Sequence, residues 1–572
     1  MTVTESARLE GANGVGATTP SGVALVSAVT AVGAALRLAH YFARPSLHLD
    51  EARLALDVAT RSWEGLLRPL DYDQIAPPIF LWLEKAAILT GGVNELAFRL
   101  PALVPGILCL PLLFIVARRI ASDRAALIAT AIAAVSPLLI QYSVESKPYA
   151  LDALLGLVLV YLALDWAEAP RSAQAAGRMT AAGAVAVWGS TPGIFVLAGI
   201  AAALSLGPSE TRPTRARLAA VACAWAASFT VVYLLVYHAA AANAYLQQYW
   251  GESMLAPWRP HALWRAWQAT RDVTWQIFFG STTEPPAAAR DDATVTAGAA
   301  AIVVLVGLGF QQLAITDRRR ALLLAGPLAA VFIASALGLY PIAARVMLFA
   351  APNLIIPVAA GAAAVASRPA ASRALRAATA FAGLVLLLPP LKRDLLLAGH
   401  PTAFEHVRPA VAEYRRRALP GEPIYVFTGS LPAWTFYTTD WAVPDWKRLA
   451  RTARLAVSGG PAFENAPPRG RSVGTENDSL VFALDGTREI LGAAHGAQWR
   501  SGIGLVQYDP DPGWAAAEAR RIRAAANPTV WLLVSHSYRL ELLIYPELER
   551  LGGRLEYAYG EDGVVLRRYR FP

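Results

Sequence analysis

Long apolar runs recur through the first 390 residues of this 572-residue chain and constrain its fold more than any other feature. A helix needs about 20 apolar residues to cross the hydrocarbon core of a bilayer. Only 16% of the residues are charged, whereas a soluble domain is usually nearer a quarter charged. We therefore expect a mainly α-helical, polytopic membrane bundle. The runs that approach or exceed the spanning length are 21–42, 98–118, 124–141, 149–167, 180–206, 217–239, 293–314, 321–339, 346–366 and 374–391.

The run at 180–206 decides the number of crossings. It is broken by Gly189-Ser190-Thr191-Pro192-Gly193, so it is either one kinked span or two short helices. Cationic residues gather in cytoplasmic loops. All the Arg clusters face one side only if 180–206 crosses twice, which predicts eleven crossings, a cytoplasmic amino terminus and an outer carboxyl terminus. These clusters are Arg118/Arg119/Arg124, Arg171/Arg178, Arg212/Arg215/Arg217, Arg318/Arg319/Arg320 and Arg368/Arg373/Arg376.

The net charge of +9 comes almost entirely from Arg side chains. A basic chain can bind nucleic acid, but these side chains lie in short clusters between apolar runs and not in one basic patch. The charge is therefore interpreted as a signal of membrane topology, and nucleic-acid binding is not expected.

Two outer loops, 43–97 and 240–292, follow from this topology. Within the first loop, 52–57 and 78–83 have the amphipathic pattern of helices that lie at the membrane interface. The second loop is rich in Trp and Tyr, which suits either an aromatic belt at the interface or a stacking platform for sugar or lipid. Both interpretations are open.

The composition changes at about residue 392, with more Pro, Arg, Glu and Gly. Strand and helix patterns alternate there, which predicts a small α/β domain outside the membrane. Residues 456–478 are rich in Gly and Pro and are expected to form a long loop. The predicted organisation is a disordered cytoplasmic tail (1–20), a transmembrane domain (21–391) and an extracytoplasmic α/β domain (392–572). The expected strands are 423–427, 479–484, 529–534 and 553–559, and the expected helices are 404–417, 514–526 and 538–551.

Ionisable and polar residues collect at the outer mouths of the predicted spans. Burying such groups in or near a membrane is costly unless pairing or function compensates. Although they are distant in sequence, the topology places them at one level, which indicates a shared site. The groups are Asp50 with Glu51, Asp71 with Asp73 and Gln74, Glu145 with Lys147, Tyr149 and Asp152, and Arg345.

Asp50 is the candidate general base, with Glu51 as its neighbour or orienter. A carboxylate among apolar walls can have a raised pKa and accept a proton from a hydroxyl or an amine. The competing interpretation is that the pair only caps the helix that follows. Asp152 lies one turn inside a predicted span, where an unpaired charge is expensive, so a partner or a function is expected.

Lys147 and Arg345 are cations on a side of the membrane where few others occur. An anionic phosphate is a natural partner for them. The alternative is that they pair with Glu145 or with lipid head groups. His48, His238 and His261 lie on the same side, but no pair of them has the spacing of metal ligands, so no metal is assigned.

Four ordered motifs resemble the membrane glycosyltransferases of the GT-C fold, specifically proteins like glycosyltransferase family 39. That group is related to protein O-mannosyltransferases and to the aminoarabinose transferase of lipid A. The resemblance covers about residues 21–390, and the outer domain is similar only in its placement. The motifs are Asp50-Glu51-Ala52-Arg53, Tyr72-Asp73-Gln74-Ile75-Ala76-Pro77-Pro78, Asn94-Glu95-Leu96-Ala97-Phe98-Arg99-Leu100-Pro101 and Gln141-Tyr142-Ser143-Val144-Glu145-Ser146-Lys147-Pro148-Tyr149-Ala150-Leu151-Asp152.

The resemblance implies an inverting transfer of a sugar from a polyprenyl-phosphate donor to a lipid, glycan or protein acceptor on the outer face of a cell membrane. It implies Asp50 as the base and Asp152 as a second acidic residue. We further expect Lys147 and Arg345 to bind the donor phosphate, and Arg53, Asp73, Gln74, Glu145 and Tyr149 to be donor- or substrate-binding residues. The aminoarabinose transferases carry Glu-Lys before the paired prolines, where the Glu is implicated in metal binding. This chain has Ile75-Ala76 there, which leaves a divalent cation and that donor open.

Two other functions fit parts of the sequence. A transporter or flippase for lipid-linked glycans would also place charges in a membrane cavity, although such proteins more often show inverted repeats and broken helices at mid-bilayer. A non-catalytic protein of cell-envelope assembly could use the outer domain alone, and it would tolerate the loss of Asp50.

Overall fold

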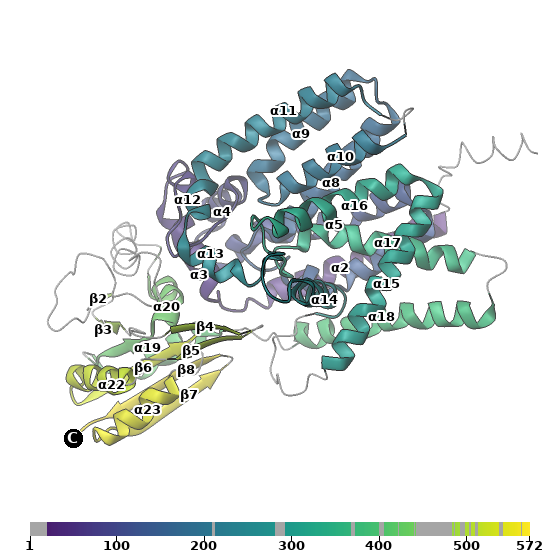
Figure 1. Cartoon of the computed structure of the whole chain (residues 1–572). Helices are drawn as coiled ribbons and strands as arrows, with labels where there is room; N and C mark the ends of the chain where they lie inside the picture. The colour runs from purple at the N-terminus through teal and green to yellow at the C-terminus, as the bar shows by residue number, and fades with distance from the viewer. Residues whose placement is uncertain are drawn as a thin grey trace, which may run out of the picture.

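The computed structural model describes most of the chain, and every structural statement below concerns the described residues. The expected tail, up to residue 19, and the expected loop at 456–478 lie outside them. Figure 1 shows a large helical body and a smaller body built around a sheet. The described ranges are 20–208, 212–280, 292–367, 372–399, 405–420, 422–439, 441, 483–484, 487–491, 498–502, 505–509, 513–536, 541–561 and 563–572.

The helical body contains the elements that carry the predicted spans. Seven stretches in the described residues are long and apolar enough to cross a membrane, and each overlaps one predicted span. The other four predicted crossings fall on α6 with α7, on α9, on α10 and on α18. The elements are α2 (Pro20–Phe42), α5 (Glu95–Ile120), α6 (Asp123–Ala134), α7 (Pro137–Gln141), α8 (Tyr149–Glu168), α9 (Ala173–Gly189), α10 (Gly193–Leu206), α11 (Arg215–Val232), the π-helix η3 (Tyr233–Tyr237), α12 (His238–Ala241), α15 (Asp292–Thr316), α16 (Arg318–Ala336), η5 (Leu348–Ala350), α17 (Ala351–Ser367) and α18 (Arg373–Gly399).

The break at 190–192 separates two helices, as the sequence predicts. α9 ends at Gly189 and α10 begins at Gly193. Thr191 and Pro192 in the turn line the large cavity described below. The other ends of the two helices lead to Arg171 and Arg212. The cationic loops and the cavity therefore lie at opposite ends of this helix pair.

Short helices connect the long ones on the cavity side. The amphipathic patterns at 52–57 and 78–83 are confirmed as helical, since α3 and α4 contain them. Helices α13 and α14 were not predicted, because the Trp and Tyr residues of that loop give no clear apolar period. The bounds are α3 (Leu49–Thr60), η1 (Gly65–Leu67), α4 (Pro78–Gly91), α13 (Ala244–Gly251) and α14 (Ala262–Phe279).

The carboxyl-terminal body is an α/β unit, as expected. Its six-stranded sheet has the order β2-β3-β1-β6-β8-β7, with β1 parallel to both β3 and β6 and the other pairs antiparallel. Strands β4 and β5 form a separate antiparallel pair. The elements are α19 (Val407–Arg417), β1 (Ile424–Val426), η6 (Thr428–Ser430), α20 (Leu431–Thr438), β2 (Ala483–Leu484), β3 (Thr487–Leu491), β4 (Gln498–Gly502), β5 (Leu505–Asp509), α22 (Trp514–Ala525), β6 (Thr529–Ser535), α23 (Glu541–Arg550), β7 (Arg554–Glu561) and β8 (Val564–Arg570).

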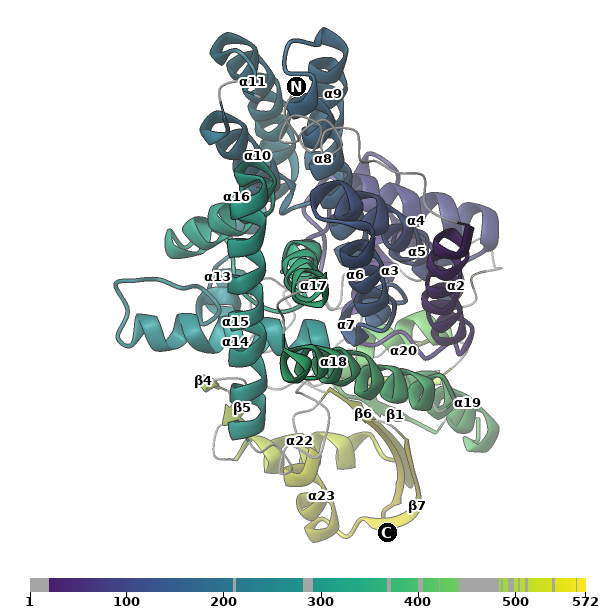
Figure 2. The same ribbon diagram turned by 90° about the vertical axis from the view of Figure 1, so that its right-hand side faces the viewer.

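Helices cover both faces of this sheet (Figure 2). Alternate residues of the buried strand β6 point to opposite faces. Leu532 packs with α22 and α23, whereas Trp531 packs with α19 and α20. The second of these cores continues into the helical body, because α3 and α4 contribute residues such as Leu56 and Phe80 to it. The α/β unit and α3 thus share one hydrophobic core.

Candidate active site

A cavity of about 1440 Å³ lies between the helical body and the α/β unit. It collects side chains from α3, from the loop before α4, from the start of α8, from α13, from the loop before η5 and from the α/β unit. Nine of the ten candidate site residues line it, and Glu51 is the exception. The nine are Asp50, Arg53, Asp73, Gln74, Glu145, Lys147, Tyr149, Asp152 and Arg345.

Asp50 lies in the first turn of α3 with cations on several sides. Its Oδ2 accepts a hydrogen bond from Arg345 Nη1 at 3.2 Å, and its Oδ1 is 3.9 Å from Arg53 Nη1. Burial raises the pKa of Asp50, but the charges of Lys147, Arg345 and Arg53 outweigh it and hold the pKa well below its usual range. The expectation of a raised pKa is therefore wrong. The interpretation of the pair as a helix cap is wrong for Asp50, because His48 occupies the N-cap position, but it holds for Glu51, whose Oε2 accepts the His48 backbone amide at 3.4 Å in a capping box.

Arg345 is held in place by aromatic side chains of α13. Its Nη2 donates a hydrogen bond to Tyr249 Oη at 3.0 Å, and its guanidinium carbon lies 5.1 Å from the centre of the Trp250 ring. A guanidinium over an indole face is a cation–π contact. The Trp- and Tyr-rich loop therefore supports a charged residue of the cavity, in addition to any contact with membrane or sugar.

Lys147 is buried and lines the same cavity. Its Nζ donates to Gln74 Oε1 at 2.8 Å, and burial lowers its pKa, with Arg345 adding to the shift and Asp50 opposing it. Gln74 follows Tyr72 and Asp73, two non-glycine residues with positive φ, so the backbone there forms a tight turn. The turn brings Gln74 beside the ammonium group.

The neighbouring polar residues are fixed by partners of their own. Asp73 accepts a hydrogen bond from Asn243 Nδ2 at 2.6 Å, and Glu145 accepts one from Gln141 Nε2 at 2.7 Å. Burial raises the pKa of both carboxyl groups. The alternative in which Glu145 pairs with Lys147 is not the arrangement seen, because Lys147 binds Gln74 instead.

Glu51 lies behind the cavity and joins three chain segments. Its carboxylate accepts hydrogen bonds from Arg99 Nε at 2.9 Å and Nη2 at 2.6 Å, and from the Ser146 amide at 2.7 Å. His48 Nδ1 lies 3.0 Å from the same carboxylate. Burial opposes ionisation of Glu51, but Arg99 and His48 outweigh it and lower the pKa.

Glu51 in turn shifts the pKa of its partner His48. Burial lowers the pKa of His48, but Glu51 outweighs this effect and raises the pKa to about 9. The Glu51 side chain therefore orients α3 and the loop of Lys147, and it does not face the cavity.

Two candidate residues project from the first turn of α8. Tyr149 stacks edge-to-face on Tyr142, with ring centres 4.9 Å apart. Asp152 is 4% exposed, and its Oδ1 lies buried without a hydrogen-bond partner in the described structure. Such an oxygen is costly unless a ligand or water satisfies it. The structure thus leaves Asp152 able to bind a ligand.

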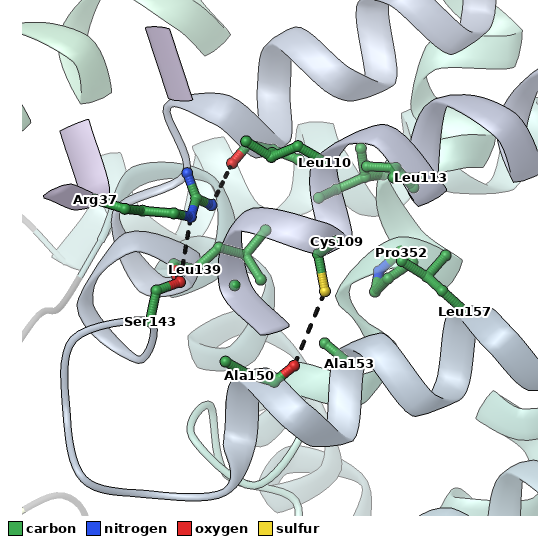
Figure 3. Close-up of a pocket in the computed structure, with 13 residues that line it drawn as sticks. Arg37, Cys109, Leu110, Leu113, Leu139, Ser143, Ala150, Ala153, Leu157 and Pro352 are labelled. Carbon is green, nitrogen blue, oxygen red and sulfur yellow. Dashed lines mark hydrogen bonds between the residues drawn. The ribbon is translucent and has the colours of Figure 1, made fainter. Parts of the chain in front are cut away.

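Arg37 lines a second, much smaller pocket and fixes the loop that carries Lys147. Arg37 on α2 is 1% exposed and donates to Ser143 Oγ at 3.2 Å in that loop (Figure 3). It also donates to the carbonyls of Ala133 at 3.1 Å and Ala134 at 3.3 Å, at the end of α6. These carbonyls have no partner within their own helix. Arg37 therefore ties α2, α6 and the active-site loop together.

The α/β unit supplies cavity residues that the sequence did not single out, among them Glu405, His536 and Glu561. His536 follows the buried strand β6, and the carboxyl ends of parallel strands are the usual place for ligands in open α/β sheets. The position of His536 directly after a buried strand is the sequence signal that could have identified it. In the described residues, no three His, Cys, Asp or Glu side chains are grouped so that they could hold a metal ion.

The comparisons with known proteins concern one segment of the chain and its fold. Residues 76–238 match the family model described as dolichyl-phosphate-mannose-protein mannosyltransferase. No curated protein sequence matches the chain. Among solved structures, the fold is similar to that of the oligosaccharyltransferase AglB from Archaeoglobus fulgidus, in complex with an inhibitory peptide and a dolichol-phosphate. That match has a TM-score of 0.51 and 13% sequence identity, and it covers 96% of this chain and 74% of AglB.

A second solved structure is ArnT from Cupriavidus metallidurans bound to undecaprenyl phosphate. It matches with a TM-score of 0.48 and 14% identity over 96% of this chain and 98% of ArnT. The AglB match extends over nearly the whole chain, and the family match covers the segment from the Pro77-Pro78 turn through α11. The chain therefore has the GT-C fold, and its residues 76–238 are similar to the dolichyl-phosphate-mannose-protein mannosyltransferase family.

Proposed function

We propose that the protein is an inverting glycosyltransferase that moves a sugar from a polyprenyl-phosphate donor to a hydroxyl-bearing acceptor at the outer face of a cell membrane. The observation that carries this proposal is the arrangement of Asp50 with Lys147 and Arg345. A carboxylate that can take a proton lies beside two cations that can hold a phosphate, inside one cavity.

The reaction follows from these three side chains. The acceptor oxygen attacks the anomeric carbon while the bond from that carbon to the phosphate oxygen breaks, and the acceptor proton passes to Asp50. Lys147 and Arg345 stabilise the negative charge that develops on the leaving phosphate. The products are the glycosylated acceptor and the polyprenyl monophosphate.

The lowered pKa of Asp50 is consistent with this role. The same cations that stabilise the Asp50 carboxylate would contact the donor phosphate. A bound phosphate offsets their charge, so the Asp50 pKa rises when the donor is present. Donor binding therefore makes Asp50 a stronger base.

The lining of the cavity suits a lipid-linked substrate. Away from the charged residues it is lined by apolar side chains of the bundle, including Leu138, Ile194, Phe195 and Phe229. Its volume of about 1440 Å³ exceeds the range of about 300–1,000 Å³ that is typical of small-molecule pockets. The phosphate would lie at the cations and the polyprenyl chain along the apolar wall. With the Arg clusters in the cytoplasm, this site and the α/β unit would face outward.

The test is transfer from radiolabelled polyprenyl-phosphate sugars in membranes that contain either the wild-type protein or Asp50→Asn. Asn keeps the shape of Asp but cannot accept the proton, so we expect transfer to fall by about 10²–10⁴-fold. The exposed Glu556→Gln, on β7 away from the cavity, serves as the matched control and should transfer like the wild type. Wild-type transfer by a correctly inserted Asp50→Asn protein would refute the base assignment. If the wild-type protein transfers sugar from none of the radiolabelled donors, the result favours a transporter or a non-catalytic assembly protein.

A further inference from the structure

Two buried polar atoms line the cavity, and the proposed mechanism uses neither of them. They are Oδ1 of Asp152 on α8 and the hydroxyl oxygen of Tyr237 on η3. Asp152 is 4% exposed and Tyr237 is 7% exposed, and neither atom has a hydrogen-bond partner among the described residues. A polar atom buried in a membrane bundle without a partner is costly unless a ligand or water satisfies it.

Tyr237 lies in an irregular part of its helix. It is the last residue of η3, a single π-helical turn that directly follows α11. Such turns are rare and are frequently found at functional sites. Tyr233, the first residue of η3, also lines the cavity. The irregular turn therefore faces the site.

Asp152 and Tyr237 come together at the turn between α9 and α10. In that turn, Ser190 hydrogen-bonds the Asp152 carboxyl group, and Thr191 lies beside the Tyr237 hydroxyl. The charge of Asp152 also acts on Tyr340. We call these five residues the Asp152–Tyr237 cluster. Among the described residues, no Lys or Arg acts on the Asp152 carboxyl group, in contrast to that of Asp50. The cluster thus consists of four hydroxyl groups and one carboxyl group.

The Asp152–Tyr237 cluster belongs to the same chain segments as the two phosphate-binding cations. Asp152 follows Lys147 by five residues, and Tyr340 precedes Arg345 by five residues. The Tyr340 hydroxyl donates a hydrogen bond to the carbonyl of Val346 at 2.9 Å, directly after Arg345. This contact fixes the cluster and the Arg345 loop relative to each other.

Tyr149 lies between the cluster and the reaction centre. The charges of Arg345 and Asp50 act on its hydroxyl group, and so does the charge of Asp152. Residues three apart lie on the same face of a helix, and Tyr149 and Asp152 are about 4.5 Å apart along the axis of α8. A group bound at the cluster is therefore next to the phosphate and the anomeric carbon.

The chemistry of the cluster selects one part of the donor. The polyprenyl chain is a hydrocarbon and cannot satisfy either buried polar atom. The sugar ring is bonded directly to the phosphate, and its hydroxyl groups both donate and accept hydrogen bonds, as do those of Tyr, Ser and Thr. We propose that Asp152 and Tyr237 form the donor-sugar subsite and bind the sugar hydroxyls far from the anomeric carbon, on C3 or C4. The inference rests on the proposed function, because the phosphate held by Lys147 and Arg345 places the sugar.

The experiment measures donor binding and does not depend on turnover. The full-length protein in nanodiscs is titrated with undecaprenyl phosphate and with its mannose, glucose and galactose conjugates. The conjugate that binds best is then compared with its 3-deoxy and 4-deoxy forms. Tyr237→Phe removes only the hydroxyl group, and Asp152→Ala removes the carboxyl group. Tyr161→Phe is the matched control, because it makes the same change on α8 at a residue that does not line the cavity.

We expect the wild-type protein to bind one conjugate at least ten-fold more tightly than undecaprenyl phosphate. Tyr237→Phe should lose about 3- to 10-fold of the affinity for this conjugate, and Asp152→Ala at least ten-fold. Both should bind undecaprenyl phosphate like the wild type, which checks that they are folded, and Tyr161→Phe should bind every lipid like the wild type. One deoxy form should bind more weakly than its parent to the wild type, but like its parent to Tyr237→Phe.

Two results would overturn the subsite. One is equal binding of the conjugate by the wild type, Tyr237→Phe and Asp152→Ala. The other is a wild-type protein that binds no conjugate more tightly than undecaprenyl phosphate. If the wild type transfers sugar in spite of either result, the proposed function stands and only the subsite is wrong. If the conjugate binds through Asp152 and Tyr237 but no sugar is transferred, the subsite stands and the proposed function is wrong.

Discussion

At the scale of single residues, the site depends on charges that are only partly balanced by the protein. The charges of Lys147 and Arg345 both act on the Asp50 carboxylate, and Arg345 donates a hydrogen bond to it. Lys147 is buried and its protein partner is a neutral amide, that of Gln74. A buried cation with a neutral partner is costly unless an anion also binds. We therefore expect Lys147 to contribute to donor binding.

Replacing Lys147 with Ala should weaken the binding of undecaprenyl phosphate by about 10- to 100-fold. A hydrogen bond to a charged group contributes about 1.5–3 kcal/mol, which corresponds to that change in Kd. Lys147→Arg keeps the charge and is the matched variant, with a loss expected to be smaller than that of Ala. Binding can be measured by quenching of the cavity Trp and Tyr fluorescence in nanodiscs. An unchanged Kd for Lys147→Ala would remove Lys147 from the donor site.

Sequence reasoning found the residues of the cavity better than it found their partners. Asp50, Lys147 and Arg345 could be predicted because a charge at the outer mouth of a span is expensive and therefore informative. Glu51 is predicted as a neighbour or orienter of Asp50, but its main partner, Arg99, could not be predicted, because it lies 48 residues away in the chain. No periodicity in the sequence reports such a long-range ion pair. The sign of the Asp50 pKa shift was missed for the same reason.

At the scale of elements, close helix contacts depend on small residues. α10 and α16 pack with Gly199 against Gly326 and Pro327, and a Cβ on Gly199 would lie 2.2 Å from the Pro327 backbone nitrogen. Small residues at such contacts let membrane helices approach closely. The turn between α9 and α10 lines the cavity, so this packing also positions part of the site.

Gly199→Ala should lower the melting temperature of the detergent-solubilised protein, because the added methyl group meets backbone that cannot move away. Overpacking of this kind costs about 1–3 kcal/mol. Gly177→Ala on α9 is the matched control. Nothing lies within 4 Å of a Cβ at Gly177, and alanine favours helix, so its melting temperature should be unchanged or higher. A Gly199→Ala protein as stable as the control would contradict the packing argument.

The elements also show where pattern reading succeeds. Charge placement predicted two helices at 180–206, and the structure has α9 and α10 there. Strands β1, β6 and β7 fall on predicted runs, since each carries a recognisable β pattern. β8 was missed, because its Arg567 and Arg568 break the apolar alternation. These side chains are stabilised by partners that only the fold provides, such as Glu422 with Arg568.

At the scale of the whole molecule, the α/β unit shares one hydrophobic core with α3, the helix that carries the candidate base. Leu56 of α3 shares a core with Trp434 and Trp531 of the α/β unit, and Tyr437 Oη receives the Leu47 amide hydrogen bond at 2.7 Å. Asp50 and the α/β unit must therefore lie on the same side of the membrane. The loops with Arg171 and Arg212 lie at the other end of the helices.

This arrangement predicts the labelling pattern of two single-cysteine variants. In a background where Cys109 and Cys223 are replaced by Ala, Glu549→Cys marks the exposed face of α23 and Arg215→Cys marks the start of α11. Because positively charged loops are retained in the cytoplasm, a membrane-impermeant maleimide should label Glu549→Cys in intact spheroplasts. It should label Arg215→Cys only after permeabilisation. Labelling of both sites before permeabilisation, or of Arg215→Cys alone, would contradict the orientation that places the site outside.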